Sequence, residues 1–212
     1  MQLSFDPRTD VRQAFATPIG RLEVPNASEI NPRIAEVVLA REKADQGVNR
    51  SNRGGWHSDN DFLSWPELQF TDLEDTFRSA IVHMIAFTTG TSKFDIKLTL
   101  EAWANVNRAG SFNSNHIHPH NHWSGVYYVQ TAGIFEDPVP KAGKIHFNDP
   151  RGPITMFRSP GQHDSLTIDP EEGVIVIFPS WLFHSVNPFT VETTRISIAF
   201  NGRIDGFRPI NG

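Results

Sequence analysis

Apolar and polar residues follow two different periods along this chain, and the change comes near Gly90. Before it, apolar residues recur three and four positions apart in two stretches, which predicts two amphipathic helices. Asn31-Pro32 predicts the start of the first helix, because a capping residue there precedes a proline suited to the first helical position. Thr71 and Glu74 have the spacing of a capping box and predict the start of the second helix, which should end at Gly90.

After Gly90 the period becomes two. Residues from Ile96 to Val106 alternate between apolar and polar side chains, which predicts a strand with one face of each kind. Turn-forming Asn, Asp, Gly and Pro residues separate the apolar runs that follow. These runs predict five further strands, at residues 123–130, 144–148, 164–168, 173–178 and 195–201. Many short strands between such turns favour a sandwich or a barrel.

The two patterns together predict a mainly β fold that occupies residues 1–212 as a single domain. Its core should be an antiparallel jelly roll over residues 93–212, and the N-terminal helical part over residues 1–92 should pack its helices outside one sheet. The segment 51–63 between the helices is rich in Gly, Asn and Ser, so we expect a long ordered loop there. An alternating edge strand near residue 96 could pair with a second copy of the chain and form a homodimer.

Composition and charge exclude several classes of function. The chain has 212 residues, a net charge of −5 and a pI near 6.0, which argues against nucleic-acid binding because that function needs a concentrated basic surface. No stretch reaches the ~20 apolar residues that span a bilayer. The first segment, MQLSFDPRTDVRQAF, lacks the pattern of a signal peptide. We therefore expect a cytoplasmic protein that binds neither nucleic acid nor membrane. Cysteine is absent, so a transition-metal site must use nitrogen and oxygen ligands.

Histidine is concentrated in one short run, HIHPHNH. Four of the nine histidines lie there within seven residues: His116, His118, His120 and His122. Neutral imidazole is the commonest metal-binding side chain near neutral pH. Residues two apart in a strand point the same way, so His116 and His118 can reach one metal, while Pro119 should divert the chain after them. His184 follows the buried run GVIVIF and can supply a third ligand from a neighbouring strand. Three such ligands leave open positions that suit iron binding both a co-substrate and oxygen.

Other interpretations of the polar residues stay open. A carboxylate from elsewhere could complete the metal site; the candidates are Glu101, Asp149 and Asp164. The site could also hold a non-catalytic zinc ion. Asn105 and Asn107 on the polar face of the first strand could line the mouth of the active site, although solvation is the simpler role. Four tryptophans could shape a substrate pocket, although packing is the simpler role for each: Trp56, Trp103, Trp123 and Trp181. The isolated histidines are expected to be structural: His57, His83, His146 and His163.

Longer motifs carry a resemblance to known proteins. The segments GSFNSNHIH (110–118) and GVIVIFPSWLFH (173–184) have the residue types and spacing of the two signature motifs of the cupin superfamily. The runs HIHPHNHWSGVYYV, NDPRGP, FPSWLFHSVNPF and RISIAFN, with SNRGGW nearer the N-terminus, resemble a family of putative 2-oxoglutarate-Fe(II) oxygenases. The resemblance covers most of the chain. It implies a double-stranded β-helix and an Fe(II) enzyme that consumes 2-oxoglutarate and O2.

The resemblance also implies roles by position. His116 and His184 would be the first and last iron ligands. Most 2-oxoglutarate oxygenases have Asp or Glu two residues after the first histidine, and this chain departs from that pattern with His118. Arg195, eleven residues after His184, would hold the far carboxylate of 2-oxoglutarate, which a guanidinium fork matches in geometry and charge. Tyr128 lies where a tyrosine hydroxyl often helps to hold the same carboxylate, although it could equally be a core residue.

These observations lead to one leading hypothesis and two alternatives. The chain should be an oxidoreductase, an Fe(II)/2-oxoglutarate-dependent dioxygenase that hydroxylates a small-molecule substrate. Because a third histidine replaces the usual carboxylate, a three-His cupin-type dioxygenase that does not use 2-oxoglutarate is the first alternative. A jelly-roll binding module with a non-catalytic metal is the second. Succinate production separates the hypothesis from the first alternative, and oxygen uptake separates both from the second.

Overall fold

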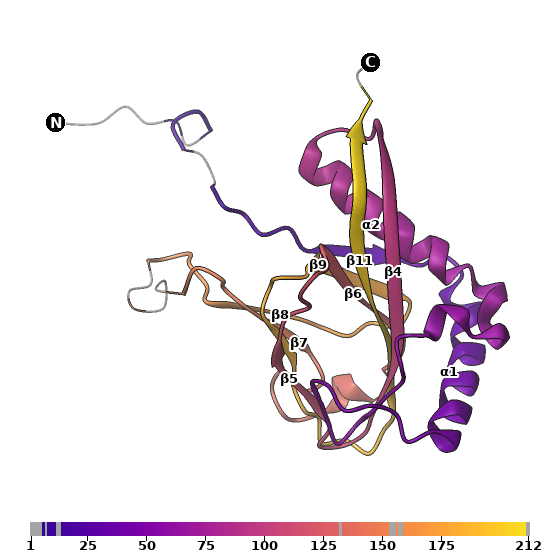
Figure 1. Cartoon of the computed structure of the whole chain (residues 1–212). Helices are drawn as coiled ribbons and strands as arrows, with labels where there is room; N and C mark the ends of the chain where they lie inside the picture. The colour runs from indigo at the N-terminus through magenta and orange to yellow at the C-terminus, as the bar shows by residue number, and fades with distance from the viewer. Residues whose placement is uncertain are drawn as a thin grey trace.

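The structure, a computed structural model, describes residues 6, 8–11, 14–131, 133–152, 156 and 159–210. Two antiparallel sheets build its core, and two helices lie outside the larger sheet (Figure 1). The larger sheet has the strand order β1 (Gly20–Glu23), β9 (Val174–Pro179), β6 (Trp123–Gln130), β11 (Arg195–Pro209), β4 (Phe94–Asn107) and β3 (Trp56–His57). The smaller sheet has the order β2 (Asn52–Arg53), β5 (Phe112–His116), β10 (His184–Val186), β7 (Ile145–Asn148) and β8 (Ser165–Ile168).

The helices are α1 (Ala27–Ala44) and α2 (Leu73–Thr89), with short 3-10 turns at Phe62–Ser64, Pro66–Thr71 and Ile134–Glu136. Both helices bury their apolar stripes against one face of β4, β6 and β11. The Phe77 ring of α2 stacks on the Phe200 ring of β11, with centroids 4.2 Å apart. Gly125 of β6 makes room for Phe200, since a Cβ there would lie 2.3 Å from that ring. The expected mainly β jelly roll with helices outside one sheet is thus confirmed.

The opposite face of the larger sheet looks into the barrel. On β4, Ala102 and Ala104 pack toward the helices, whereas Trp103 and Asn105, which alternate with them, line an internal cavity. On β11, the alternate residues from Arg195 to Asn201 also line cavities. The strand expected over residues 96–107 is therefore confirmed, and its polar face borders the interior of the barrel.

The starts of both helices differ from the sequence expectation. The first helix begins at Ala27, so Pro32 lies inside it, and Asn31 accepts a hydrogen bond from the Tyr127 hydroxyl at 2.5 Å and caps nothing. The expected capping box at the second helix does not form, because the Thr71 hydroxyl donates to the Leu68 carbonyl at 2.7 Å. In both cases the side chain that a cap would need is hydrogen-bonded to another group, Asn31 to a strand residue and Thr71 to a nearby carbonyl. The helix end at Gly90 is confirmed, with φ +69° there.

The N-terminal part also contributes strands to the barrel. The segment 51–63, expected as a loop, contains β2 and β3, which pair with β5 and β4. Residues of β1 pair with β9 at the other edge of the larger sheet. Strand β11 continues past its expected end at residue 201 and forms a long ribbon with β4 beyond the barrel (Figure 1). Neither described helix has the length and apolar character that a membrane span requires.

Candidate metal centre

Three histidines converge at one end of the barrel. His116, the last residue of β5, pairs directly with His184, the first residue of β10. His118 lies just beyond β5, and its backbone N–H donates to the Ser180 carbonyl at 3.0 Å, which holds the chain beside β10. One ring nitrogen from each of the three side chains lies within 4.8 Å of the others. The structure therefore brings together the three side chains that the sequence predicted as ligands.

The surroundings of these rings favour neutral imidazoles in an orientation that suits metal binding. The His116 Nδ1 lies 2.7 Å from the Ser114 carbonyl, and the His184 Nδ1 lies 2.8 Å from the Leu182 carbonyl. A carbonyl only accepts, so each Nδ1 must carry the proton, which leaves Nε2 with a free lone pair. Burial, reinforced by the neighbouring imidazoles, lowers the pKa of His118 and of His184 to about 3. At neutral pH these rings are metal-binding bases that carry no charge.

The rest of the histidine run points elsewhere. His120 is exposed, with φ +69°, and follows Pro119 in a turn. His122 is exposed too, and its Nδ1 accepts a hydrogen bond from the Ile204 N–H at 3.0 Å. Neither ring belongs to the cluster of three. This placement agrees with the expected diversion of the chain at Pro119.

Within the described ranges, no carboxylate joins the three histidines. Glu101 accepts hydrogen bonds from the amides of Asn60 and Asn201, each at 2.8 Å. Asp149 is paired with the Arg151 guanidinium at 2.5 Å. Asp164 is likewise outside the cluster. The donor set in the structure is three imidazole nitrogens.

Arg195 and Tyr128 share a small inner cavity with the histidines. The cavity has a volume of about 60 Å³ and is also bordered by His116, His118 and His184. Arg195 is only 2% exposed, and its Nη1 donates a hydrogen bond to the Ser197 hydroxyl at 3.3 Å. Its Nε and the Tyr128 hydroxyl are buried and have no hydrogen-bond partner among the described residues. Burial raises the pKa of Tyr128 and lowers the pKa of Arg195.

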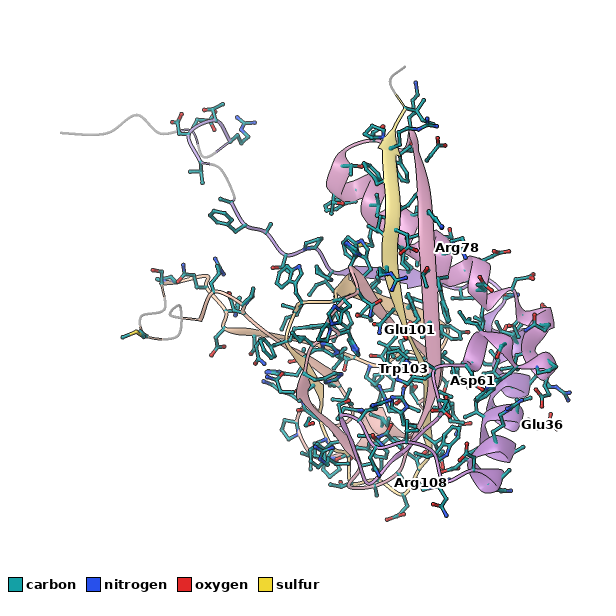
Figure 2. All side chains as sticks on the ribbon, in the orientation of Figure 1. Glu36, Asp61, Arg78, Glu101, Trp103 and Arg108 are labelled. Carbon is teal, nitrogen blue, oxygen red and sulfur yellow. The ribbon has the colours of Figure 1, made fainter. Side chains whose placement is uncertain are left out.

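An outer cavity of about 450 Å³ opens beside the same histidines. Glu101 and Trp103 of β4, both labelled in Figure 2, line it together with His57. His57 is buried, and its ring stacks on Trp103 at 5.4 Å. The sequence marked His57 only as structural, because an isolated histidine in a Gly-rich segment carries no spacing signal. Its place beside the cluster follows from the pairing of β3 with β4.

Comparisons with known proteins agree with this geometry. Residues 101–201 match the model of a family described as putative 2OG-Fe(II) oxygenases. No curated protein sequence matches the chain. Among solved structures, a prolyl-4-hydroxylase from Pseudomonas putida is 17% identical, with a TM-score of 0.61 over 89% of this chain and 93% of its own.

Two further structures are similar at lower identity. A prolyl hydroxylase from Trichoplax adhaerens, in complex with a hypoxia inducible factor peptide fragment, is 14% identical, with a TM-score of 0.56 over 87% of this chain and 83% of its own. HygX from Streptomyces hygroscopicus, with nickel and 2-oxoglutarate bound, is 11% identical, with a TM-score of 0.57 over 88% of this chain and 83% of its own.

Likeness at such identities establishes the jelly-roll fold, whereas the family match carries the activity and the cofactors. The matched range contains all three clustered histidines, Tyr128 and Arg195. The family match confirms the expected resemblance and the expected use of Fe(II) and 2-oxoglutarate. Over residues 101–201 this chain matches the family of putative 2OG-Fe(II) oxygenases, and the match supports a 2OG-Fe(II) oxygenase, which is an oxidoreductase.

Proposed function

We propose that His116, His118 and His184 hold the iron and that Arg195, assisted by Tyr128, holds the far carboxylate of 2-oxoglutarate. The chain would then hydroxylate a small-molecule substrate with O2. The observation that carries this proposal is the buried Arg195 guanidinium, whose Nε has no hydrogen-bond partner among the described residues, in a cavity that the three histidines also line.

The histidine cluster suits iron(II) in ligand type and protonation. Three neutral imidazoles from adjacent strands leave the other side of a bound metal open to ligands. Carbonyl oxygens of Ser114 and Leu182 fix two of the rings through their Nδ1–H groups. When bound, Fe(II) and 2-oxoglutarate supply hydroxylation of a C–H bond by O2, with the oxoacid converted to succinate and CO2.

Arg195 and Tyr128 suit an anion in the inner cavity. A charged group removed from water costs several kcal/mol unless an opposite charge or hydrogen bonds compensate it. Among the described residues, Arg195 has a hydrogen bond to the neutral Ser197 hydroxyl and an Nε without a partner, so a carboxylate would supply the charged acceptor that these residues lack. The Tyr128 hydroxyl can donate a second hydrogen bond to the same group. The protein's share is to bind and orient the oxoacid and to exclude water around it.

An anaerobic titration of the Fe(II) protein with 2-oxoglutarate tests the proposal. Arg195→Ala should keep its iron but bind the oxoacid more weakly by about 2–5 kcal/mol, which is some thirty-fold to several thousand-fold in dissociation constant. Arg195→Lys should recover only part of the loss, because an ammonium cannot reproduce the guanidinium fork. Arg203→Ala is the matched control, since Arg203 is exposed and pairs with Asp205. Equal binding by wild type and Arg195→Ala would contradict the assignment of Arg195.

The absence of a carboxylate from the described cluster favours one second candidate, a three-His dioxygenase whose substrate binds the metal directly. A three-His site carries one more net positive charge than a site with two histidines and a carboxylate, which changes how the metal interacts with anions. The same titration separates the two candidates. No binding of 2-oxoglutarate at millimolar concentration, together with substrate-dependent O2 uptake, would favour the second candidate.

The location and partners also belong to this proposal. We expect a cytoplasmic protein that binds no nucleic acid, supported by its net charge of −5. A homodimer through the edge of the β4 ribbon stays a prediction, and light scattering of the purified protein tests it.

A further inference from the structure

The outer cavity beside the histidines contains a carboxylate that forms no ion pair with a Lys or Arg of the described residues. Of the described residues that line this cavity, only Glu101 is acidic, and it is half-buried. Within the described part of the chain, no Lys or Arg forms an ion pair with it. Arg50 also lines this cavity, but it is exposed and makes no ion pair with Glu101. A partly desolvated carboxylate of this kind gains from a cationic ligand.

The Glu101 carboxylate is held in place by neutral groups. The Asn201 amide donates to Oε1 at 2.8 Å, and the Asn121 amide reaches the same oxygen at 3.4 Å. The Asn60 amide donates to Oε2 at 2.8 Å. Two oxygens can accept about four hydrogen bonds, so these three donors leave one acceptor position free on Oε2. The amides fix the side chain without cancelling its charge.

The hydrogen bonds of Glu101 also run toward the metal centre. Asn201 Oδ1 accepts from the Ser124 hydroxyl at 2.7 Å, and the hydroxyls of Ser124 and Ser180 lie 3.0 Å apart. The Ser180 carbonyl in turn accepts from the His118 N–H at 3.0 Å. A continuous chain of bonds therefore sets the position of Glu101 relative to His118.

Trp103 bridges the space between Glu101 and the histidines. Residues two apart on a strand share a face and lie about 7 Å apart, so Glu101 and Trp103 stand side by side on β4 (Figure 2). The Trp103 ring lies 5.5 Å from the His118 ring and borders both the inner and the outer cavity. A ligand held at Glu101 would lay its carbon chain along this ring, with its far end at the cluster.

We propose that the outer cavity binds the primary substrate and selects a small molecule with an ammonium or guanidinium group, which Glu101 receives. This inference rests on the proposed function, because the histidine cluster must be the reaction centre. The cation sits at Glu101, the carbon chain packs on Trp103, and a C–H bond several atoms from the cation faces the histidines.

Matched pairs of small molecules test the charge preference. n-Butylguanidine and n-butylurea have nearly the same shape, but only the guanidine is cationic; n-butylamine and n-butanol form a second pair. Calorimetric titration of the anaerobic protein loaded with Fe(II) and 2-oxoglutarate should show at least one cationic member binding about tenfold or more tightly than its neutral partner. The wild-type comparison needs no variant. If neither cation is preferred at millimolar concentration, the proposal is overturned.

Variants then assign the preference to Glu101. Glu101→Gln removes the charge with little change of shape and should erase the discrimination, whereas Glu101→Asp should keep part of it. Glu42→Gln is the control, because Glu42 pairs with Arg108 away from the cavity. Discrimination that survives Glu101→Gln would also overturn the proposal. If 2-oxoglutarate itself binds while no cation is preferred, only this inference falls; if 2-oxoglutarate does not bind, the proposed function falls.

Discussion

Two consecutive tyrosines of β6 have opposite environments. Tyr127 faces the helices, and its hydroxyl donates to Asn31 of α1 at 2.5 Å. Tyr128 faces the inner cavity, and its hydroxyl has no hydrogen-bond partner among the described residues, although the ring is fully buried and lies 5.2 Å from the Arg195 guanidinium carbon. The fold satisfies the Tyr127 hydroxyl, and under the proposed function the Tyr128 hydroxyl would bind a ligand. The contrast teaches that the two faces of one strand can differ in whether the fold itself supplies hydrogen-bond partners for their polar groups.

The same contrast holds across the larger sheet. Its helix-facing side carries apolar residues such as Ile198 and Phe200, which pack with α1 and α2. Its cavity-facing side carries Arg195, Ser197 and Trp103. Because strand residues alternate, each strand serves stability on one side and chemistry on the other. Substitutions on the helix-facing side should therefore change stability, and substitutions on the cavity-facing side should change ligand binding.

The largest expected effect is on iron content, and it extends the comparison to the histidine run. His116→Ala or His184→Ala should lose most of the bound iron, because one of three ligands disappears. His120→Ala and His122→Ala should retain it, since both side chains are exposed and outside the cluster. Metal analysis after Fe(II) loading measures the difference. Equal loss in all of these variants would mean that the run binds metal as an unstructured tract.

A substitution on the helix-facing side should change stability alone. Phe200→Ala removes a fully buried ring that stacks on Phe77, and should cost about 3–5 kcal/mol of unfolding free energy. The affinity of the folded protein for 2-oxoglutarate should not change. Phe207→Ala, on the exposed end of the same strand, should cost less than about 1 kcal/mol. Urea unfolding measures both; a large loss of oxoacid affinity in Phe200→Ala would break the comparison.

The cavity-facing side should make the metal-free protein sensitive to acid. His118 and His184 have pKa values of about 3 in the folded protein, against about 6.5 when unfolded. Between these values the unfolded chain binds more protons, so stability falls as the pH decreases from 6.5 toward 3. Each histidine contributes about 1.4 kcal/mol per pH unit, or about 2–3 kcal/mol for the pair.

Unfolding free energies measured with chelator at pH 6 and pH 5 test this expectation. The double variant His118→Gln/His184→Gln is the reference, because its glutamines do not titrate. Its stability should depend less on pH over this interval. An identical slope in both proteins would show that the two histidines do not lie neutral and buried.

The smallest expected effect separates the two tyrosines themselves. Tyr127→Phe leaves the buried Asn31 oxygen without its donor and should cost about 1–3 kcal/mol of stability, with oxoacid affinity unchanged. Tyr128→Phe should leave stability within about 0.5 kcal/mol, because its hydroxyl has no partner to lose, and should weaken 2-oxoglutarate binding about tenfold. Paired melting and titration experiments measure both. The opposite assignment of the two effects would refute the distinction.

The sequence by itself predicted β4, β6, β7, β8, β9 and the first half of β11, together with the three clustered histidines, because alternation and the His-x-His spacing are local properties. The strands β5 and β10 lie outside the expected ranges. It also singled out Arg195 and Tyr128 as candidates for holding 2-oxoglutarate, through the resemblance of their motifs to an oxygenase family. Pro119 predicted that the histidine run divides, and His120 and His122 indeed lie outside the cluster.

Only the tertiary structure decided which partners the polar side chains have. Asn31 has the local signature of a helix cap, but Tyr127, 96 residues away in sequence, uses it as an acceptor. Alternation along β4 showed two faces, yet whether the polar face meets solvent or an inner cavity depends on the second sheet closing over it. His57 joins the site because β3 pairs with β4. Long-range pairing sets these environments, and no pattern within one segment contains that information.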